Sequence, residues 1–305
     1  MAQVLAAPFP YFGGKRRAAS LVWNALGDPS GYVEPFAGSA AVLLGRPAFK
    51  GRRVETLNDA DGWLVNLWRS IQLSPDDVAR HAWGPVAEID YHARLAWLQE
   101  RRTPDLVAWL EGDPEAHDAK AAGWWLTVVA AGIGDPWGPG PWRVVDGHLR
   151  ELPHLGNAGQ GDLAAYMQAL AHRLHRVRIT CGDWRRVVTP SVSRAGAGGD
   201  GSRAILLDPP YATSGDLYAE SSAGISDEVR EWCVSGVEGF RVVLCGYDHE
   251  HDDLLGHGWE VIDGKAGGGA GYSVRSDNGR RERLWLSPEA VKHEIQQGFD
   301  FGGAA

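Results

Sequence analysis

The fold is decided by Ala204-Ile205-Leu206-Leu207-Asp208-Pro209-Pro210-Tyr211. The four apolar residues that begin this stretch predict a short strand buried in the centre of a sheet. Two consecutive prolines cannot continue a hydrogen-bond ladder, so the strand ends near Asp208 and the chain turns. The turn presents a carboxylate, carbonyl groups and an aromatic ring at the carboxyl end of a strand, which is where open α/β sheets bind ligands.

The chemistry of this turn suits an exocyclic amine on a flat ring. Such an amine needs two acceptors for its N–H groups, and its ring needs a flat surface, and Asp208 to Tyr211 offer both. The alternative interpretation is a structural proline turn in which Asp208 is only a capping residue. The rest of the chain makes that alternative less favoured.

The composition is that of a soluble globular protein. The chain has 305 residues, 44% hydrophobic and 23% charged, enough for one large domain or two modest ones. We expect no membrane span and no signal peptide. Three scattered cysteines favour free thiols in a reducing, cytoplasmic compartment. The net charge of −9 argues weakly against nucleic-acid binding over the whole surface, while clusters of basic residues leave local binding open.

The two ends of the chain have the alternating strand and helix patterns of an α/β fold. The expected strands are 31–36, 53–57, 177–181, 204–207, 241–245, 259–262 and 283–286. One expected helix of these parts begins near residue 40, and two others cover 62–72 and 227–237. Ser74-Pro75 is expected to mark the end of the helix at 62–72. Between them, tryptophans and helical patterns dominate, at 91–98, 106–110, 124–131 and 163–175, with a Gly- and Pro-rich loop at 132–142.

Glycine motifs near the N-terminus do not match the common phosphate-binding loops. Pro10-Tyr11-Phe12-Gly13-Gly14-Lys15 lacks the first glycine of a Walker motif and the Ser or Thr after its lysine. Phe36-Ala37-Gly38-Ser39-Ala40 lacks the Gly-x-Gly-x-x-Gly pattern. A nucleotide-like ligand without a pyrophosphate is therefore favoured. Asp59, at the end of the next expected strand, is placed to accept hydrogen bonds from ribose hydroxyls.

Four motifs in this order resemble those of the Dam-type DNA N6-adenine methyltransferases. They are Tyr11-Phe12-Gly13-Gly14-Lys15, Val33-Glu34-Pro35-Phe36-Ala37-Gly38-Ser39, Asn58-Asp59 and Asp208-Pro209-Pro210-Tyr211. The likeness extends to 244–247 and 283–288. It implies a Rossmann-like methyltransferase core over 1–75 and 176–288, which binds S-adenosyl-L-methionine. It also implies a mostly helical and irregular target-recognition domain inserted at 76–175, with a C-terminal tail at 289–305.

The resemblance also implies roles for single residues. Tyr11 and Lys15 would contact the amino-acid end of the cofactor or its surroundings, Gly38 would allow close backbone approach, Asp59 would hold the ribose, and Asp183 would contact the adenine ring. The other cofactor-binding candidates are Phe12, Gly14, Glu34, Phe36 and Asp208. The chain departs from the family pattern at Ala40, where many relatives have Gly, and at Tyr11, where some have Trp.

The catalytic candidates implied by the resemblance are Asp208, Pro209, Pro210 and Tyr211. The N6 of adenine is a poor nucleophile because its lone pair is delocalised into the ring. Asp208 and the Pro209 carbonyl would accept its two hydrogens and free that lone pair, and Tyr211 would stack on the flipped-out base. In-line transfer of the methyl group would then depend chiefly on positioning, and no metal is required.

We expect DNA contacts from basic and aromatic residues in loops. The candidates are Trp142, Arg143 and Arg150 in the insert and Arg275, Arg280 and Arg281 near the C-terminal strands. Trp124 and Trp125 are expected in the core of the insert. His249, His251, Asp252 and Asp253 could suggest a metal site, but a solvated polar helix start is favoured.

The sequence thus predicts a site-specific DNA adenine N6-methyltransferase that acts on double-stranded DNA, with a cognate restriction enzyme as a further candidate partner. An N4-cytosine methyltransferase is the nearest alternative, and Asp rather than Ser at position 208 disfavours it. A catalytically idle DNA-binding homologue is the alternative from another class, and the intact Asp208-Pro209-Pro210-Tyr211 disfavours it.

Overall fold

The structure is a computed structural model. It describes residues 5–9, 15–16, 18–47, 52–82, 88–101, 105–131, 144–145, 148–149, 163–194, 201–210, 219–263 and 281–290.

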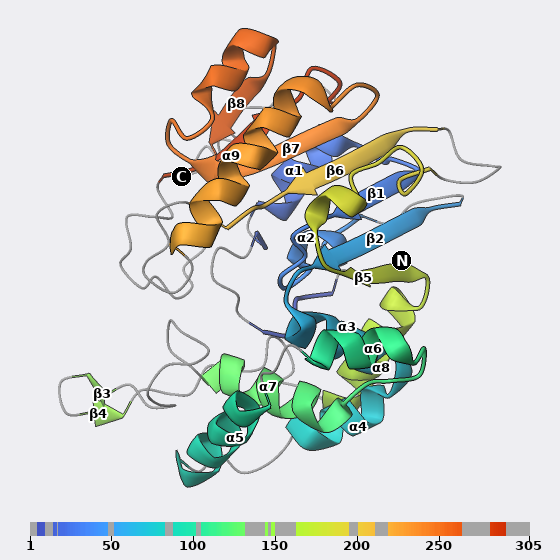
Figure 1. Cartoon of the computed structure of the whole chain (residues 1–305), viewed down its shortest axis with the longest axis vertical. Coiled ribbons are helices and arrows are strands. Elements are labelled where there is room, and N and C mark those ends of the chain that lie inside the picture. Colours follow the sequence, from blue (N-terminus) through green and yellow to red (C-terminus); the bar gives the residue numbers. More distant parts are fainter. Residues whose placement is uncertain are drawn as a thin grey trace, which may run out of the picture.

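A mixed sheet is the centre of the fold (Figure 1). Its strands in chain order are β1 (Gly31–Glu34), β2 (Val54–Asp59), β5 (Val177–Cys181), β6 (Arg203–Leu207), β7 (Arg241–Tyr247), β8 (Glu260–Asp263) and β9 (Glu282–Leu286). Within the described residues they form a seven-stranded sheet in the order β5-β2-β1-β6-β7-β9-β8. The strands from β5 to β7 are parallel, and β9 runs antiparallel to both β7 and β8.

The strand order is compatible with a Rossmann-like core. When the five parallel strands are numbered along the chain, their order is 3-2-1-4-5, as in doubly wound nucleotide-binding sheets. The central strands are continuous apolar runs, and Ala204 to Leu207 are all at most 4% exposed. Such runs form when both faces of a parallel sheet are covered. The fold is therefore mixed α/β, as the sequence predicts.

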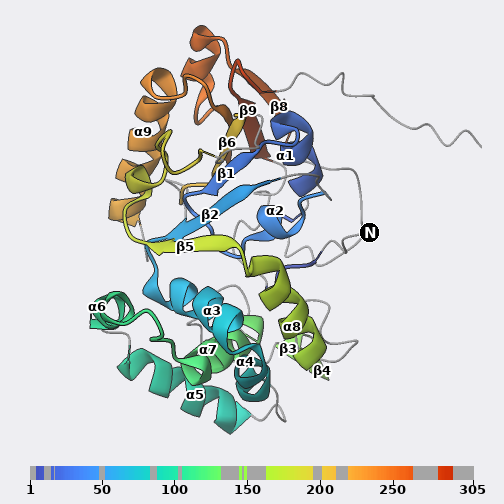
Figure 2. The ribbon, with the colours of Figure 1, turned by 90° about the vertical axis from the view of Figure 1, so that its right-hand side faces the viewer.

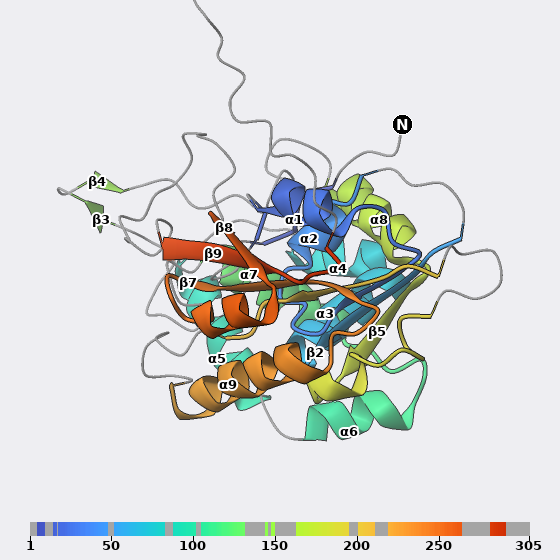
Figure 3. The same ribbon diagram turned by 90° about the horizontal axis from the view of Figure 1, so that it is seen from above.

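Helices cover both faces of the sheet. Short helices α1 (Ala19–Leu26) and α2 (Ala41–Leu44) lie on one face, and the long α9 (Ala219–Ser235) lies on the other (Figure 3). Further helices gather beyond strand β5 (Figure 2). These are α3 (Gly62–Leu73), α4 (Pro75–Ala82), α5 (Glu88–Glu100), α6 (Asp105–Gly112), α7 (Ala119–Ala131) and α8 (Leu163–Leu174). A small hairpin of β3 (Val144–Val145) and β4 (His148–Leu149) follows α7 in the chain.

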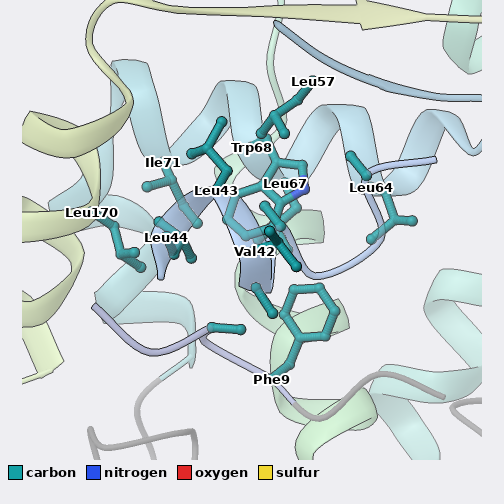
Figure 4. Close-up of a cluster of buried hydrophobic side chains, with 14 of the residues drawn as sticks. Phe9, Val42, Leu43, Leu44, Leu57, Leu64, Leu67, Trp68, Ile71 and Leu170 are labelled. Atoms are coloured by element: carbon teal, nitrogen blue, oxygen red, sulfur yellow. The ribbon is translucent and has the colours of Figure 1, made fainter. Parts of the chain in front are cut away.

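One buried cluster joins the helices beyond β5 to the sheet. Trp68 of α3 is 1% exposed, and its ring lies beside Phe9, with centroids 5.9 Å apart. Figure 4 shows both rings among leucines of α2, α3 and α8. The Trp68 indole N–H also donates to the Gly38 carbonyl at 3.2 Å. Helix α3 therefore anchors the loop that follows β1. The division into a core and an inserted domain stays a prediction.

The expected strands are confirmed to within two residues at each end. The helices differ more. Helix α2 is only four residues long and ends before Gly45, and α9 begins at Ala219, well before the expected start. Pro75 was expected only to punctuate the preceding helix, but it also begins α4, because proline is favoured in the first turn, where its missing N–H costs nothing. In the described part of the chain, no helix is both long enough and apolar enough to cross a membrane.

Candidate active site

Four carboxylates lie at the carboxyl ends of four neighbouring strands. Glu34 ends β1, Asp59 ends β2, Asp208 follows β6, and Asp183 lies two residues beyond β5. Strand β1 pairs with β2 on one side and with β6 on the other, so the strand order reverses there. Ligands of open α/β sheets bind at the carboxyl edge beside such a reversal. The topology therefore gathers residues from distant motifs at one edge.

Asp208 forms a close ion pair with Lys15. The Lys15 ammonium lies 2.9 Å from Asp208 Oδ1, and their side chains are 4% and 21% exposed. Burial lowers the pKa of Lys15, but the Asp208, Cys245 and Glu282 side chains outweigh burial and raise it above its ordinary value. Lys15 is therefore a charged ammonium at neutral pH. It contacts Asp208 directly, where the resemblance implied only a contact with the cofactor or its surroundings.

Asp59 holds the glycine turn that follows β1. Its Oδ2 accepts the Gly38 N–H at 3.0 Å, and its Oδ1 accepts the Asp61 N–H at 2.9 Å. Gly38 has φ of 45°, in the left-handed region that glycine adopts without strain. Each carboxylate oxygen has a second acceptor position, so Asp59 can still accept hydrogen bonds from a ligand.

Burial raises the pKa of Asp59 to about 6, although hydrogen bonds from the backbone of Asp61 and Gly38 partly oppose this rise. The carboxyl group is therefore ionised near neutral pH and becomes protonated under mildly acidic conditions. An ionised Asp59 is an acceptor only, which suits hydroxyl donors.

Asn58 links the loops after β1 and β5. Its side-chain amide donates to the Pro35 carbonyl and to the Gly182 carbonyl, both at 2.9 Å. Asn58 is 1% exposed, and its backbone carbonyl accepts a hydrogen bond from the Ala37 N–H at 2.9 Å. It therefore fixes the turns that carry Gly38 and Asp183. The sequence showed Asn58 as part of a motif but gave no sign of this bridging role.

Glu34 points into the protein interior. It is 2% exposed, and the Tyr32 hydroxyl donates to its Oε1 at 2.7 Å. Burial raises the pKa of Glu34 to about 8, although hydrogen bonds from Tyr32 and the Leu43 backbone partly oppose this rise. The side chain is therefore mostly neutral at pH 7. The observed contacts place Glu34 beneath the edge, in support of the β1 terminus.

Phe36 and Asp183 form a second part of the same edge. The rings of Phe36 and Trp184 lie 5.9 Å apart, and the Trp184 side chain is buried. Asp183 caps the 3-10 turn over Trp184–Arg186, because its Oδ1 accepts the Arg185 N–H at 2.7 Å. Its side chain is 48% exposed and also pairs with the Arg185 guanidinium at 2.9 Å. Aromatic surface and an accessible carboxylate thus lie side by side.

Ala40 has an unusual backbone conformation. It is fully buried, with φ of 51° and ψ of 27°, and it precedes α2. The left-handed region costs a non-glycine residue about 1 to 2 kcal/mol. Alanine at this position is therefore tolerated at a cost in stability.

The segment after β7 differs from the expectation of a solvated polar helix start. His249 is exposed and pairs with Asp252 at 2.6 Å, but His251 is 1% exposed and packs edge-on against Trp285. Burial lowers the pKa of His251. The expectation was therefore wrong for His251. The described residues contain no group of three or more metal-ligand side chains.

Of the DNA-binding candidates, Arg281 is described. It is exposed just before β9, and its guanidinium lies 5.5 Å from the centroid of the Tyr247 ring, at the end of β7. Pro209 is buried and Pro210 is exposed. The candidates outside the described residues are Tyr11, Phe12, Gly14, Tyr211, Trp142, Arg143, Arg150, Arg275 and Arg280, with the loop at 132–142 and the tail beyond residue 290.

The two tryptophans expected in the core differ in their surroundings. Trp125 is 3% exposed and packs edge-on against Phe9, with centroids 5.0 Å apart. Trp124 is only half-buried and contacts Trp97 at 4.9 Å. The Lys120 ammonium lies 4.4 Å from the Trp124 ring and 4.9 Å from the Trp97 ring. The expectation is thus confirmed for Trp125, while Trp124 belongs to a partly exposed aromatic and basic surface.

No family model matches the chain, and no curated protein matches it.

Proposed function

We propose that the chain is a site-specific DNA adenine N6-methyltransferase that uses S-adenosyl-L-methionine. The observation that carries the proposal is the position of Asp208, which ends a buried strand beside the point where the strand order reverses and is followed by two prolines. Asp59 and Asp183 lie at the same edge. This arrangement offers acceptors for an amine next to groups suited to a nucleoside.

The described residues fit the adenosine part of the cofactor. Asp59 can accept hydrogen bonds from ribose hydroxyls, and Gly38, which has no side chain, would let a ligand approach the backbone closely. The partly exposed Phe36 offers flat apolar surface for a ring, and the half-exposed Asp183 offers an acceptor for an exocyclic amine. When bound, S-adenosyl-L-methionine supplies an electrophilic methyl group on a sulfonium.

Asp208 would act on the target amine. The ion pair with Lys15 fixes the orientation of this carboxylate, whose oxygens act as hydrogen-bond acceptors. The Pro209 carbonyl would accept the second hydrogen of the amine. With both hydrogens held by these acceptors, the nitrogen lone pair would be less delocalised into the ring and more available for attack on the methyl group. Tyr211 would stack on the base. The rate then depends on how well these groups are positioned.

A basic and aromatic surface supports a nucleic-acid partner. Beyond the Lys120 contacts, the Arg101 guanidinium lies 3.8 Å from the Trp97 ring centroid, and that of Arg94 lies 5.9 Å from the Trp124 ring centroid. Cations gathered on α5, directly after it at Arg101, and on α7 favour a local contact with phosphates in a chain whose net charge is −9. Duplex DNA, a cognate restriction enzyme and a cytoplasmic location all belong to this proposal.

Product analysis tests the proposal directly. The chain is incubated with mixed-sequence duplex DNA and S-adenosyl-L-methionine carrying a labelled methyl group, and the DNA is digested to nucleosides for mass analysis. We expect labelled N6-methyldeoxyadenosine. Labelled N4-methyldeoxycytidine would favour the cytosine alternative, whose amine needs the same two acceptors. No product from a protein that binds cofactor and DNA would favour the idle homologue.

A further inference from the structure

A second carboxylate, Glu282, lies close to the pair of Lys15 and Asp208. Its Oε1 is 3.8 Å from the Lys15 ammonium, and its side chain is 27% exposed. Glu282 begins β9 and is in register with Tyr247, the last residue of β7. Because β7 is parallel to β6, this register brings Glu282 to the edge that carries Asp208. None of the sequence motifs above assigns Glu282 a role.

The negative charge of Glu282 acts on several groups at this edge. Burial lowers the pKa of Lys15 and raises the pKa values of Cys245 and Tyr247, and the Glu282 carboxylate adds an upward shift to all three. An upward shift means that the carboxylate favours a bound proton, which is a positive charge, on each of them. The same field acts on any other cation that binds among these groups.

We propose that Glu282 makes the site prefer a cationic ligand, so that S-adenosyl-L-methionine binds more tightly relative to S-adenosyl-L-homocysteine than it would without this carboxylate. The inference rests on the proposed function. The two ligands share the adenosine and amino-acid parts, and they differ by a methyl group and the positive charge on sulfur. Their affinity ratio therefore reports the electrostatic preference, and contacts common to both cancel. A carboxylate that favours the cation also favours release of the neutral product after transfer.

The test compares the two affinities by titration calorimetry in three variants and the wild type. Glu282→Gln removes the charge and keeps the shape, and Glu282→Asp keeps the charge. Glu260→Gln is the matched control, because Glu260 is exposed on the neighbouring β8, in register with Leu286 at the far end of β9. We expect Glu282→Gln to lower the preference for S-adenosyl-L-methionine by roughly threefold to tenfold, the effect of one charge several ångströms away in a partly solvated site.

The preference should be retained by Glu282→Asp and by Glu260→Gln, and the loss in Glu282→Gln should shrink at high salt, because salt screens a partly exposed charge. An unchanged ratio in Glu282→Gln, or an equal loss of affinity for both ligands, would overturn the inference and leave the proposed function standing. A wild-type chain that binds neither ligand would overturn the proposed function and the inference with it.

Discussion

The Lys15 ammonium and the Asp208 carboxylate, 2.9 Å apart, join the N-terminal segment to the strand end that carries the proposed chemistry. Lys15 is almost fully buried, so its charge depends on nearby carboxylates for compensation. The pair therefore serves the stability of the fold as well as the orientation of Asp208.

This pairing gives the first prediction. Asp208→Ala removes the closer of the two carboxylates beside Lys15, and we expect a loss of about 3 to 5 kcal/mol in the free energy of unfolding. Adding Lys15→Met should recover part of that loss, because the buried charge is then gone. Urea unfolding of the two single variants and the double variant measures the coupling. Losses that simply add would show that the two side chains do not depend on each other.

The second prediction concerns Asp59. Asp59→Asn replaces one acceptor oxygen with an N–H donor and so breaks one of two backbone hydrogen bonds, to Gly38 or to Asp61. We expect weaker binding of S-adenosyl-L-methionine and a loss of about 1 to 3 kcal/mol in stability. The control is Asp61→Asn, since Asp61 caps α3 through the Trp63 N–H and asparagine caps a helix equally well. Equal effects of the two substitutions would contradict a special role for Asp59.

The third prediction is a dependence of stability on pH through Glu34. Burial raises the pKa of Glu34 to about 8 from its ordinary value of 4.5. The folded protein keeps a proton that the unfolded chain loses, so this contribution to stability is fully present below about pH 4.5 and is lost as the pH rises to about 8. The total change is on the order of 3 to 5 kcal/mol.

Glu34→Gln isolates this effect, because glutamine has nearly the same shape and stays neutral. We expect the variant to gain stability relative to the wild type as the pH is raised from 5 to 9. Denaturant unfolding at several pH values measures the difference, in which the other titrating groups cancel. A difference that is constant with pH would show that Glu34 does not titrate in this range.

The fourth prediction concerns backbone strain at Ala40. Ala40→Gly relieves a left-handed conformation, whereas Ala41→Gly, one residue later, replaces a residue in α2. Both substitutions remove a methyl group and make the unfolded chain more flexible, and both effects lower stability. Only at position 40 does relief of backbone strain offset this loss. We expect Ala40→Gly to be at least about 1 kcal/mol less destabilising than Ala41→Gly. Thermal unfolding of both variants provides the comparison, and equal losses would mean that the strain is absent.

Much of the sheet and its functional edge could be predicted from apolar runs. Parallel strands expose their carboxyl ends on one side, so the ends at Asp59 and Asp208 had to share an edge once the strands were identified. The contacts across that edge could not be predicted in this way. The register of β9 against β7 brings Glu282 beside Lys15, and no local pattern encodes that register.

Two features of the structure, the helix that begins at Pro75 and the burial of His251, differ from the prediction for reasons that can be found locally. Pro75 terminates one helical pattern and begins another, and the sequence signal is the same for both. His251 lies among acidic and basic residues that indicate solvent, yet packing against Trp285 buries it. Tertiary contact overrides local polarity in that case.

The most direct measurement is single-turnover methyl transfer to duplex DNA by the wild type and by Asp208→Asn, with DNA affinity measured alongside. Asparagine preserves the shape of the side chain but replaces one acceptor with a donor. We expect transfer to adenine N6 in the wild type and a loss of at least about 100-fold in Asp208→Asn, with DNA affinity mostly intact. Full transfer by Asp208→Asn would contradict the assignment of Asp208 as the group that accepts the hydrogens of the target amine.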